Sequence, residues 1–248
     1  MSRPLVRVPL AGVVAGEVGL PPRASHYLAH VHRLGPGDRF VAFDPQAETE
    51  AEAEIIAVTR RGGSAHVRLG PPRPASLRPA RRVTLIQALG RGSKVDAVVR
   101  DATELGATCI APVLSARSVG GTRADRSGRL RRIAVEAARQ CGRGDAPLIE
   151  PTAPLPEALR RHAPSAGSGL GLCLHPRAAT PLGAALRELR SEGEVVLVVG
   201  PEGGLTDEEL GLGASLRYRA VSLGPLVLRS ETVCAAALGA LLAWGAAR

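Results

Sequence analysis

VVLVVGPEGGLTDEE, residues 195–209, passes from an apolar strand-like run through a Gly/Pro turn into the start of a helix. A second stretch, LGPLVLRSETV at residues 223–233, has the same order of apolar run, turn and helix start. Turns at the carboxyl ends of strands are where an open α/β sheet binds a small ligand. Neither turn has the glycine spacing of the dinucleotide-binding or P-loop motifs. The two turns therefore predict a ligand site of a different α/β class.

The chain around these turns alternates apolar strands with helices from residue 83 onward. The expected strands cover residues 83–88, 108–113, 170–174, 194–199 and 220–223. The expected helices cover residues 93–105, 125–141, 155–162, 181–189 and 233–244, with a short helix after Thr206. Strands that are apolar throughout and alternate with helices indicate a parallel sheet with both faces covered. We therefore predict an α/β domain with a parallel sheet.

A different pattern occupies the first part of the chain. Short strands are expected at residues 3–8, 39–43, 53–58 and 65–69. Between them, residues 25–34 are expected to form a helix with Leu28, Val31 and His32 on one face. A small β-barrel with one helix fits this pattern.

Proline-rich sequence around residues 70–80 separates the two patterns, and such sequence is extended and semi-rigid. We therefore expect a β-barrel domain at residues 1–72, a linker at residues 73–82 and the α/β domain at residues 83–248.

The chain is strongly basic, with a formal net charge of +9 and a pI near 10.7. This balance favours a polyanionic partner, and nucleic acid rather than a membrane surface. Part of the arginine content can instead reflect genome composition, because Lys94 is the only lysine. Aromatic residues make up 2% of the chain, which argues against base stacking on aromatic platforms. RNA contacts are therefore expected from arginine side chains, backbone groups and shape.

The cysteines and histidines do not form a metal-binding pattern. The four cysteines are far apart and include no C-x-x-C pair, so we expect free thiols in a reducing cytosol. His26 and His30 are four residues apart, but Tyr27 stands where a zincin motif has glutamate. We therefore expect no metal site. The sequence also has no signal peptide and no membrane-spanning run, so a cytoplasmic location without a membrane partner is expected.

The first turn, residues 200–204, holds Glu202 between a proline and a glycine at a strand end. Its glycines let a ligand approach the backbone, and a carboxylate in such a loop is more often functional than structural. Thr206 and Glu209 fit the capping-box pattern T-x-x-E, so a helix is expected to begin there. A tight turn with a good cap explains the glycines without a ligand, but it leaves Glu202 unexplained.

The second turn leads into an apolar helix. Ser230 is a natural N-cap, and Glu231 suits the positive end of a helix dipole. Residues 233–244 are almost entirely Ala, Leu and Gly, and a helix that is apolar all round must be buried. Burial in the core and burial in a homodimer seam both remain open.

Both turns resemble those of the SPOUT class of RNA methyltransferases. More narrowly, they resemble the ribosomal RNA small subunit methyltransferase E family, which methylates N3 of a uridine. The resemblance covers nearly the whole chain. It extends to ATELG at residues 102–106, ARSV at 116–119, EAARQCGR at 136–143, and, in a PUA-like RNA-binding domain, HYL at 26–28, VHRL at 31–34 and GD at 37–38. It implies that the last strand, turn and helix form a trefoil knot, a rare exception to unthreaded topologies.

The resemblance also implies S-adenosyl-L-methionine as the cofactor, 16S ribosomal RNA of the small subunit as the partner, and a homodimer. The implied cofactor-binding residues lie in or near the two turns: Leu174, Gly200, Glu202, Gly203, Leu223, Gly224, Leu228, Arg229 and Thr232. The implied RNA contacts are Arg7, His26, Arg33 and Arg117.

Methylation of N3 of uracil requires the removal of its proton, by a general base or with a cation that stabilises the uracil anion. Glu202 and Glu231 are the candidate bases, and Arg229 and Arg143 are the candidate cations. Simpler roles exist for two of them, because Glu231 can serve the helix dipole and Arg143 can be a surface cation.

The chain departs from the family pattern before ATELG, where Asp101 replaces a residue that is usually basic. This change bears on the RNA contacts, whereas the two turns are intact. Two alternatives remain: a SPOUT methyltransferase acting on a ribose 2′-hydroxyl or a transfer-RNA base, and a non-catalytic RNA-binding assembly factor. A P-loop enzyme is supported only by GRGSK at residues 90–94, whose spacing is wrong.

Overall fold

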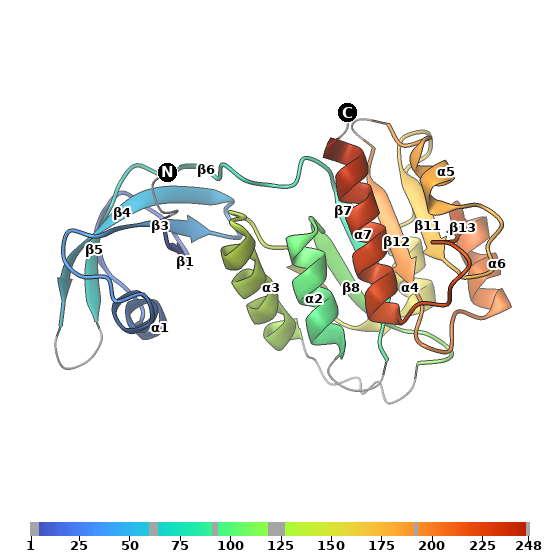
Figure 1. Cartoon of the computed structure of the whole chain (residues 1–248), viewed down its shortest axis with the longest axis horizontal. Helices are drawn as coiled ribbons and strands as arrows, with labels where there is room; N and C mark the ends of the chain where they lie inside the picture. The colour runs from blue at the N-terminus through green and yellow to red at the C-terminus, as the bar shows by residue number, and fades with distance from the viewer. Residues whose placement is uncertain (1–4, 60–63, 91–93, 119–126, 191–192, 247–248) are drawn as a thin grey trace. The chain divides into compact units, whose positions relative to one another are not determined.

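A computed structural model describes residues 5–59, 64–90, 94–118, 127–190 and 193–246 (Figure 1). The chain divides into two compact units, one of residues 1–78 with 138–146, the other of residues 79–137 with 147–248. The first unit thus includes residues 138–146, which were expected from the sequence to lie in the α/β domain. The exact domain boundaries expected from the sequence remain predictions.

The first unit is built on a six-stranded sheet with the order β1-β3-β4-β5-β2, in which β6 also pairs with β4. Its strands are β1 (Arg7–Pro9), β2 (Gly16–Gly19), β3 (Arg39–Asp44), β4 (Thr49–Val58), β5 (Ala65–Leu69) and β6 (Arg73–Pro74). β1 and β3 are parallel, and the other pairs are antiparallel. Alternate residues of β5 are buried, as expected for a sheet with one face on a core. Closure of this sheet into a barrel remains a prediction.

The helix expected at residues 25–34 begins and ends three residues earlier and changes its winding. It consists of α1 (Pro22–His26) and a π-helical segment, η1 (Tyr27–Val31), in which the backbone N–H of His32 donates to the carbonyl of Tyr27. Leu28 is fully buried, but Val31 is 59% exposed and His32 is also exposed. The π turn has a different residue spacing from an α-helix, so these three residues do not share one buried face.

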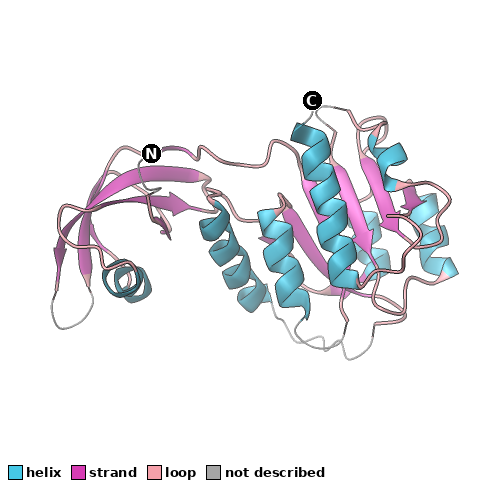
Figure 2. Ribbon diagram, in the orientation of Figure 1, coloured by secondary structure: helices cyan, strands magenta, loops and turns pink. Residues whose placement is uncertain are grey.

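The second unit is a parallel sheet with the order β10-β8-β7-β12-β11-β13, in which β9 also pairs with β8. Its strands are β7 (Val83–Ala88), β8 (Cys109–Leu114), β9 (Leu148–Ile149), β10 (Ala153–Pro154), β11 (Leu170–Leu174), β12 (Val195–Val199) and β13 (Tyr218–Val221). Its helices are α2 (Lys94–Glu104), α3 (Ser127–Cys141), α4 (Leu155–Arg161), α5 (Leu182–Leu186), α6 (Asp207–Ser215) and α7 (Ser230–Ala246). The predicted parallel α/β architecture is therefore confirmed (Figure 2).

Helices cover both faces of this sheet because its strands are apolar on both sides. Leu85 packs in a core with residues of α2, α5 and α7, whereas the next residue, Ile86, packs in a core with residues of α4 and α6. α2 and α7 lie side by side over one face (Figure 1). Within α7, Cys234, Leu238 and Leu241 are buried whereas the next residue, Leu242, is 52% exposed, so one side of this helix is in the core. Among the described residues, no helix is both long and apolar enough to cross a membrane.

Candidate functional site

The carboxyl ends of β7, β11, β12 and β13 lie along one edge of the parallel sheet, where both turns are found. Parallel strands end at a common edge, so segments distant in sequence are brought together there. Two recesses in this edge contain five of the site residues proposed from the sequence. We call them the polar recess and the apolar recess.

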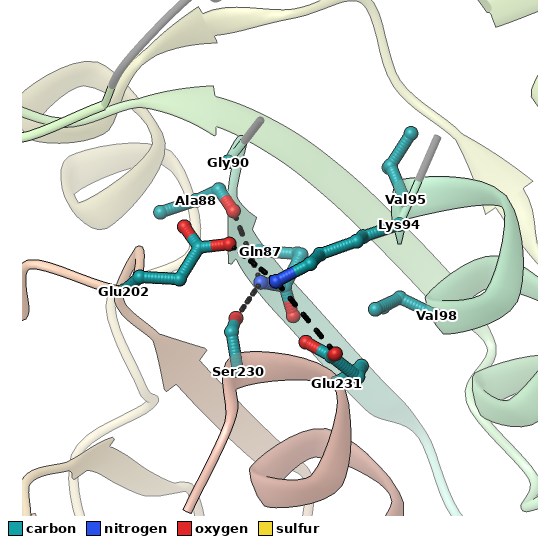
Figure 3. Close-up of a pocket in the computed structure, with 9 residues that line it drawn as sticks. All are labelled: Gln87, Ala88, Gly90, Lys94, Val95, Val98, Glu202, Ser230 and Glu231. Carbon is teal, nitrogen blue, oxygen red and sulfur yellow. Dashed lines mark hydrogen bonds and ion pairs between the residues drawn. The ribbon is translucent and has the colours of Figure 1, made fainter. Parts of the chain in front are cut away.

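The polar recess has a volume of about 270 Å³, part of it open to solvent. It is lined by residues from β7, α2, the first turn and the start of α7: Gln87, Ala88, Gly90, Lys94, Val95, Val98, Glu202, Ser230 and Glu231 (Figure 3). A Cβ atom at Gly90 would lie 2.5 Å from the Glu202 carboxylate, so a glycine permits this close approach. The recess therefore unites both candidate bases.

Lys94 lies between the two carboxylates. Its Nζ is 2.8 Å from Glu202 Oε1 and 3.7 Å from Glu231 Oε1. The hydrogen bond to Glu202 raises the pKa of Lys94 above its usual value of 10.5, so the ammonium form persists throughout the neutral range. Sequence reasoning did not assign Lys94 to this site, although its status as the only lysine was a signal.

Gln87, a buried residue of β7, is held by a chain of hydrogen bonds. Its Nε2 donates to the carbonyl of Ala88 at 3.0 Å and to Ser230 Oγ at 2.9 Å. Ser230 Oγ in turn donates to the carbonyl of Gly200 at 3.1 Å. This chain joins β7 to both turns. Gln87 was also missed from the sequence, where the only signal was a polar residue near the end of an apolar strand.

The apolar recess has a volume of about 330 Å³, part of it open to solvent, and lies at the ends of β11 and β13. It is lined by Leu174, His175, Pro176, Leu223, Leu226, Val227, Leu228 and Val233. Three of these, Leu174, Leu223 and Leu228, were expected from the sequence to line the cofactor site. Gly224, another expected cofactor residue, has a φ of +131°, a conformation that requires glycine at this turn.

The first turn is held in place by two side chains from other segments. Arg117 Nη1 donates to the carbonyl of Gly203 at 2.9 Å. Glu209 accepts from the backbone N–H of Thr206 and from that of Ala116, both at 2.8 Å. The Thr206 side chain accepts from the N–H of Glu209, which confirms the predicted capping box. Arg117, expected as an RNA contact, thus lies against the first turn.

Arg229 and Thr232 are exposed residues on either side of the start of α7. Arg229 lies in the chain between Leu228 of the apolar recess and Ser230 of the polar recess. Its position leaves the guanidinium accessible to solvent at the same edge of the sheet. The roles expected for both residues remain predictions.

Arg143 and Arg7 belong to the first unit, and both are engaged. Arg143 is 4% exposed and donates to both carboxylate oxygens of Asp145, at 3.0 and 2.7 Å. The interpretation of Arg143 as a surface cation is therefore wrong. Arg7 is bonded to Glu50 at 2.9 Å, and its guanidinium lies 5.0 Å from the centre of the Phe43 ring. Its charge is already balanced inside the protein.

His26 and Arg33 remain accessible on the first unit. The His26 ring is exposed and stacks on His30, with 4.8 Å between ring centres. Arg33 is exposed and has a φ of +57°, which is uncommon for a non-glycine residue. Of the four expected RNA contacts, these two and Arg117 are exposed, whereas Arg7 is partly buried.

One group of metal-type ligands occurs among the described residues, at the opposite edge of the parallel sheet. Atoms of Cys109, Glu150 and His162 lie within 4.8 Å of one another. Glu150 Oε2 is already 2.9 Å from Arg161 Nη1 and 3.2 Å from His162 Nε2. Burial raises the pKa of the Cys109 thiol to about 12, which disfavours the thiolate that binds metals. The arrangement is that of an ion-pair cluster.

Comparison with known proteins adds to this geometry. The sequence matches an RNA methyltransferase domain over residues 77–242 and an RNA methyltransferase PUA domain over residues 20–67. Ribosomal RNA small subunit methyltransferase E of Synechocystis sp. is 33% identical over 239 residues, which cover 93% of this chain and 75% of the relative. The protein of the same name from Mycobacterium bovis is 31% identical over 234 residues, covering 92% and 85%.

Two solved structures have similar folds over the full length. Ribosomal RNA small subunit methyltransferase E of Neisseria gonorrhoeae, bound to S-adenosyl methionine, has a TM-score of 0.84 and 28% identity, covering 96% of this chain and 97% of its own. A putative methyltransferase from Legionella pneumophila, in complex with the same cofactor, has a TM-score of 0.81 and 28% identity, covering 98% of each. The chain therefore belongs to the ribosomal RNA small subunit methyltransferase E family of SPOUT RNA methyltransferases, as its two turns predicted.

Proposed function

We propose that this protein transfers a methyl group from S-adenosyl-L-methionine to N3 of a specific uridine in 16S ribosomal RNA of the small subunit. The observation that carries the proposal is the adjacency of the two recesses, one apolar and one holding two carboxylates and an ammonium group. The names of the relatives support the RNA class, and the chemistry of the polar recess supports a proton-bearing acceptor.

The apolar recess suits the cofactor. Leu174, Leu223 and Leu228 provide apolar walls at strand ends. Such walls fit an adenosine group, and two similar solved structures contain this cofactor. When bound, S-adenosyl-L-methionine supplies an electrophilic methyl group on a sulfonium. Gly200, Glu202, Gly203, Gly224, Arg229 and Thr232 complete the proposed cofactor-binding set.

The residues of the polar recess handle the acceptor. Glu231, or Glu202 in its place, accepts the N3 proton, so an N–H bond breaks and a carboxyl O–H bond forms. Lys94 and the nearby Arg229 stabilise the negative charge that develops on the uracil ring. Because Arg143 is bound to Asp145 within the first unit, we assign it a secondary place among the candidate cations.

RNA binding is proposed for the first unit through His26 and Arg33, with Arg117 beside the cofactor turn. Arg7 stays in this set as the least accessible member. A homodimer, the trefoil knot and the domain boundaries at residues 72 and 83 are parts of the same proposal. A cytoplasmic location follows from the proposed substrate.

The test is to incubate the protein with labelled S-adenosyl-L-methionine and small ribosomal subunits whose RNA lacks the modification. The RNA is then digested and the methylated nucleoside identified. We expect 3-methyluridine. A different methylated nucleoside would retain SPOUT chemistry but replace the acceptor, whereas absence of both label and cofactor binding would favour the non-catalytic RNA-binding alternative.

A further inference from the structure

Two buried acceptor atoms in the polar recess lack any donor in the described part of the chain. They are Gln87 Oε1 and Glu231 Oε2, and neither has a hydrogen-bond partner. Buried polar atoms are nearly always paired, because an unpaired one loses its interactions with water without compensation. Figure 3 shows both side chains at the recess that also holds Lys94. The missing donor is therefore expected to come from a bound ligand.

The orientation of the Gln87 amide is fixed by its neighbours. Nε2 has two hydrogens, and they go to the Ala88 carbonyl and to Ser230 Oγ. The Ser230 hydroxyl uses its own hydrogen on the Gly200 carbonyl, so toward Gln87 it can only accept. If the oxygen and nitrogen of the amide were exchanged, the oxygen would face the Ala88 carbonyl and Ser230 Oγ, which both act as acceptors here. Gln87 thus presents an oxygen, and not an N–H group, as its unpaired atom.

The recess also offers one strong donor and apolar walls. Lys94 Nζ can donate beyond its contacts with the two glutamates, since an ammonium group has three hydrogens. Val95 and Val98 of α2 line the same recess. A complementary ligand is a flat group with an N–H beside a carbonyl oxygen. The imide edge of uracil has this order, whereas cytosine has a lone pair at the same ring nitrogen.

We propose that the polar recess binds the imide edge of the acceptor uracil, with Gln87 Oε1 accepting its N–H and Lys94 donating to a neighbouring carbonyl oxygen. Gln87 is then a specificity-determining residue that selects uridine over cytidine before the proton is removed. The inference rests on the proposed function and deepens it, since it names the atoms that recognise the base.

The primary test observes Gln87 directly in the wild-type protein. The side-chain amide of Gln87 is followed by NMR after ¹⁵N labelling of glutamine, and its signal is assigned by its loss in Gln87→Leu. The probes are uridine 5′-monophosphate, cytidine 5′-monophosphate and the N3-methylated uridine nucleotide. Gln46 and Gln140, which belong to the first unit, are internal controls. We expect the uridine nucleotide alone to shift the Gln87 signal.

An equal shift with cytidine, or no shift with uridine at saturating concentration, overturns the inference. A kinetic test accompanies this measurement. Gln87→Leu is expected to reduce kcat/KM for unmodified small subunits by about tenfold or more, while the Kd for S-adenosyl-L-methionine stays unchanged. If wild type forms 3-methyluridine but the NMR response is absent, only the inference fails. If the NMR response is selective but no methylation occurs, only the proposed function fails.

Discussion

Replacement of Arg143 by methionine tests whether this arginine is structural or catalytic. Its guanidinium donates two hydrogen bonds to Asp145, and the two side chains are only 5% and 9% exposed. Methionine keeps much of the volume but leaves the Asp145 carboxylate buried without its cation. Breaking one half of a buried pair costs about 3–5 kcal/mol, several times the effect at an exposed pair. We expect a loss of about 3 kcal/mol in the free energy of unfolding.

The assay is urea unfolding followed by far-UV circular dichroism, with calorimetry to separate transitions of the two units. Arg143→Met combined with Asp145→Leu is the matched control, because replacing both partners by apolar groups removes the unpaired charge. The double variant is expected to recover part of the lost stability. Methyl transfer is measured for both variants well below their unfolding temperatures, where a purely structural residue leaves the rate unchanged.

Two results would refute this reasoning. A stability loss below about 1 kcal/mol would mean that the pair behaves like an exposed one. A normally stable Arg143→Met protein whose methylation rate falls by orders of magnitude would instead establish the catalytic role that the sequence suggested. The structure favours the structural outcome because the arginine is buried and already donates two hydrogen bonds to Asp145.

Three further predictions concern single side chains. Burial raises the pKa of Asp44, but hydrogen bonds from the backbone N–H groups of residues 12, 46 and 47 outweigh this effect and lower the pKa below 3.8. The stabilisation from the Asp44 carboxylate is therefore present above pH 3.8 and is lost as the pH falls further, so the difference in unfolding free energy between wild type and Asp44→Asn should shrink in that range during acid unfolding. Gly144→Ala should lower the free energy of unfolding, measured in urea, by about 1–3 kcal/mol, because the new Cβ would lie 2.2 Å from that of Ala75. The control, Gly128→Ala in α3, places its Cβ near no other atom and should leave the free energy of unfolding unchanged or raise it. Lys94→Met should lower kcat/KM for methyl transfer by about tenfold or more, since the recess loses the ammonium group proposed to stabilise the developing negative charge, and Lys94→Arg should restore part of it. An unchanged kcat/KM in the methionine variant contradicts the role given to this lysine.

The architecture of the second unit was predictable because its signals are local. The strands expected at residues 83–88 and 170–174 coincide with β7 and β11. Both are apolar throughout, and a sheet buried on two faces imposes that composition on each strand independently of its neighbours. The helix start at Thr206 was predictable for the same reason, since a capping box involves only four consecutive residues.

Features that depend on exposure or on unusual winding were not predictable. β2 has the sequence GEVG and all four residues are exposed, so no apolar alternation marks it as a strand. The π-helical turn at Tyr27–Val31 displaced Val31 from the face where α-helical spacing puts it. The burial of Arg143 depends on residues 138–146 grouping with a unit that begins far away in sequence. The sequence pattern alone indicates none of these three features.

The candidate site lies between these extremes, and its organisation explains why only part of it was predicted. The turns themselves carry recognisable residues, but Gln87 enters only through strand register, which pairs it with Val199 immediately before the first turn. The start of α7 then serves both recesses: Leu228 and Val233 line the apolar recess, whereas Ser230 and Glu231 line the polar one. A single helix start therefore fixes the proposed cofactor position relative to the proposed base position. Transfer between two ligands requires such alignment, and the hydrogen-bond chain from Gln87 through Ser230 to Gly200 holds that helix start to the sheet.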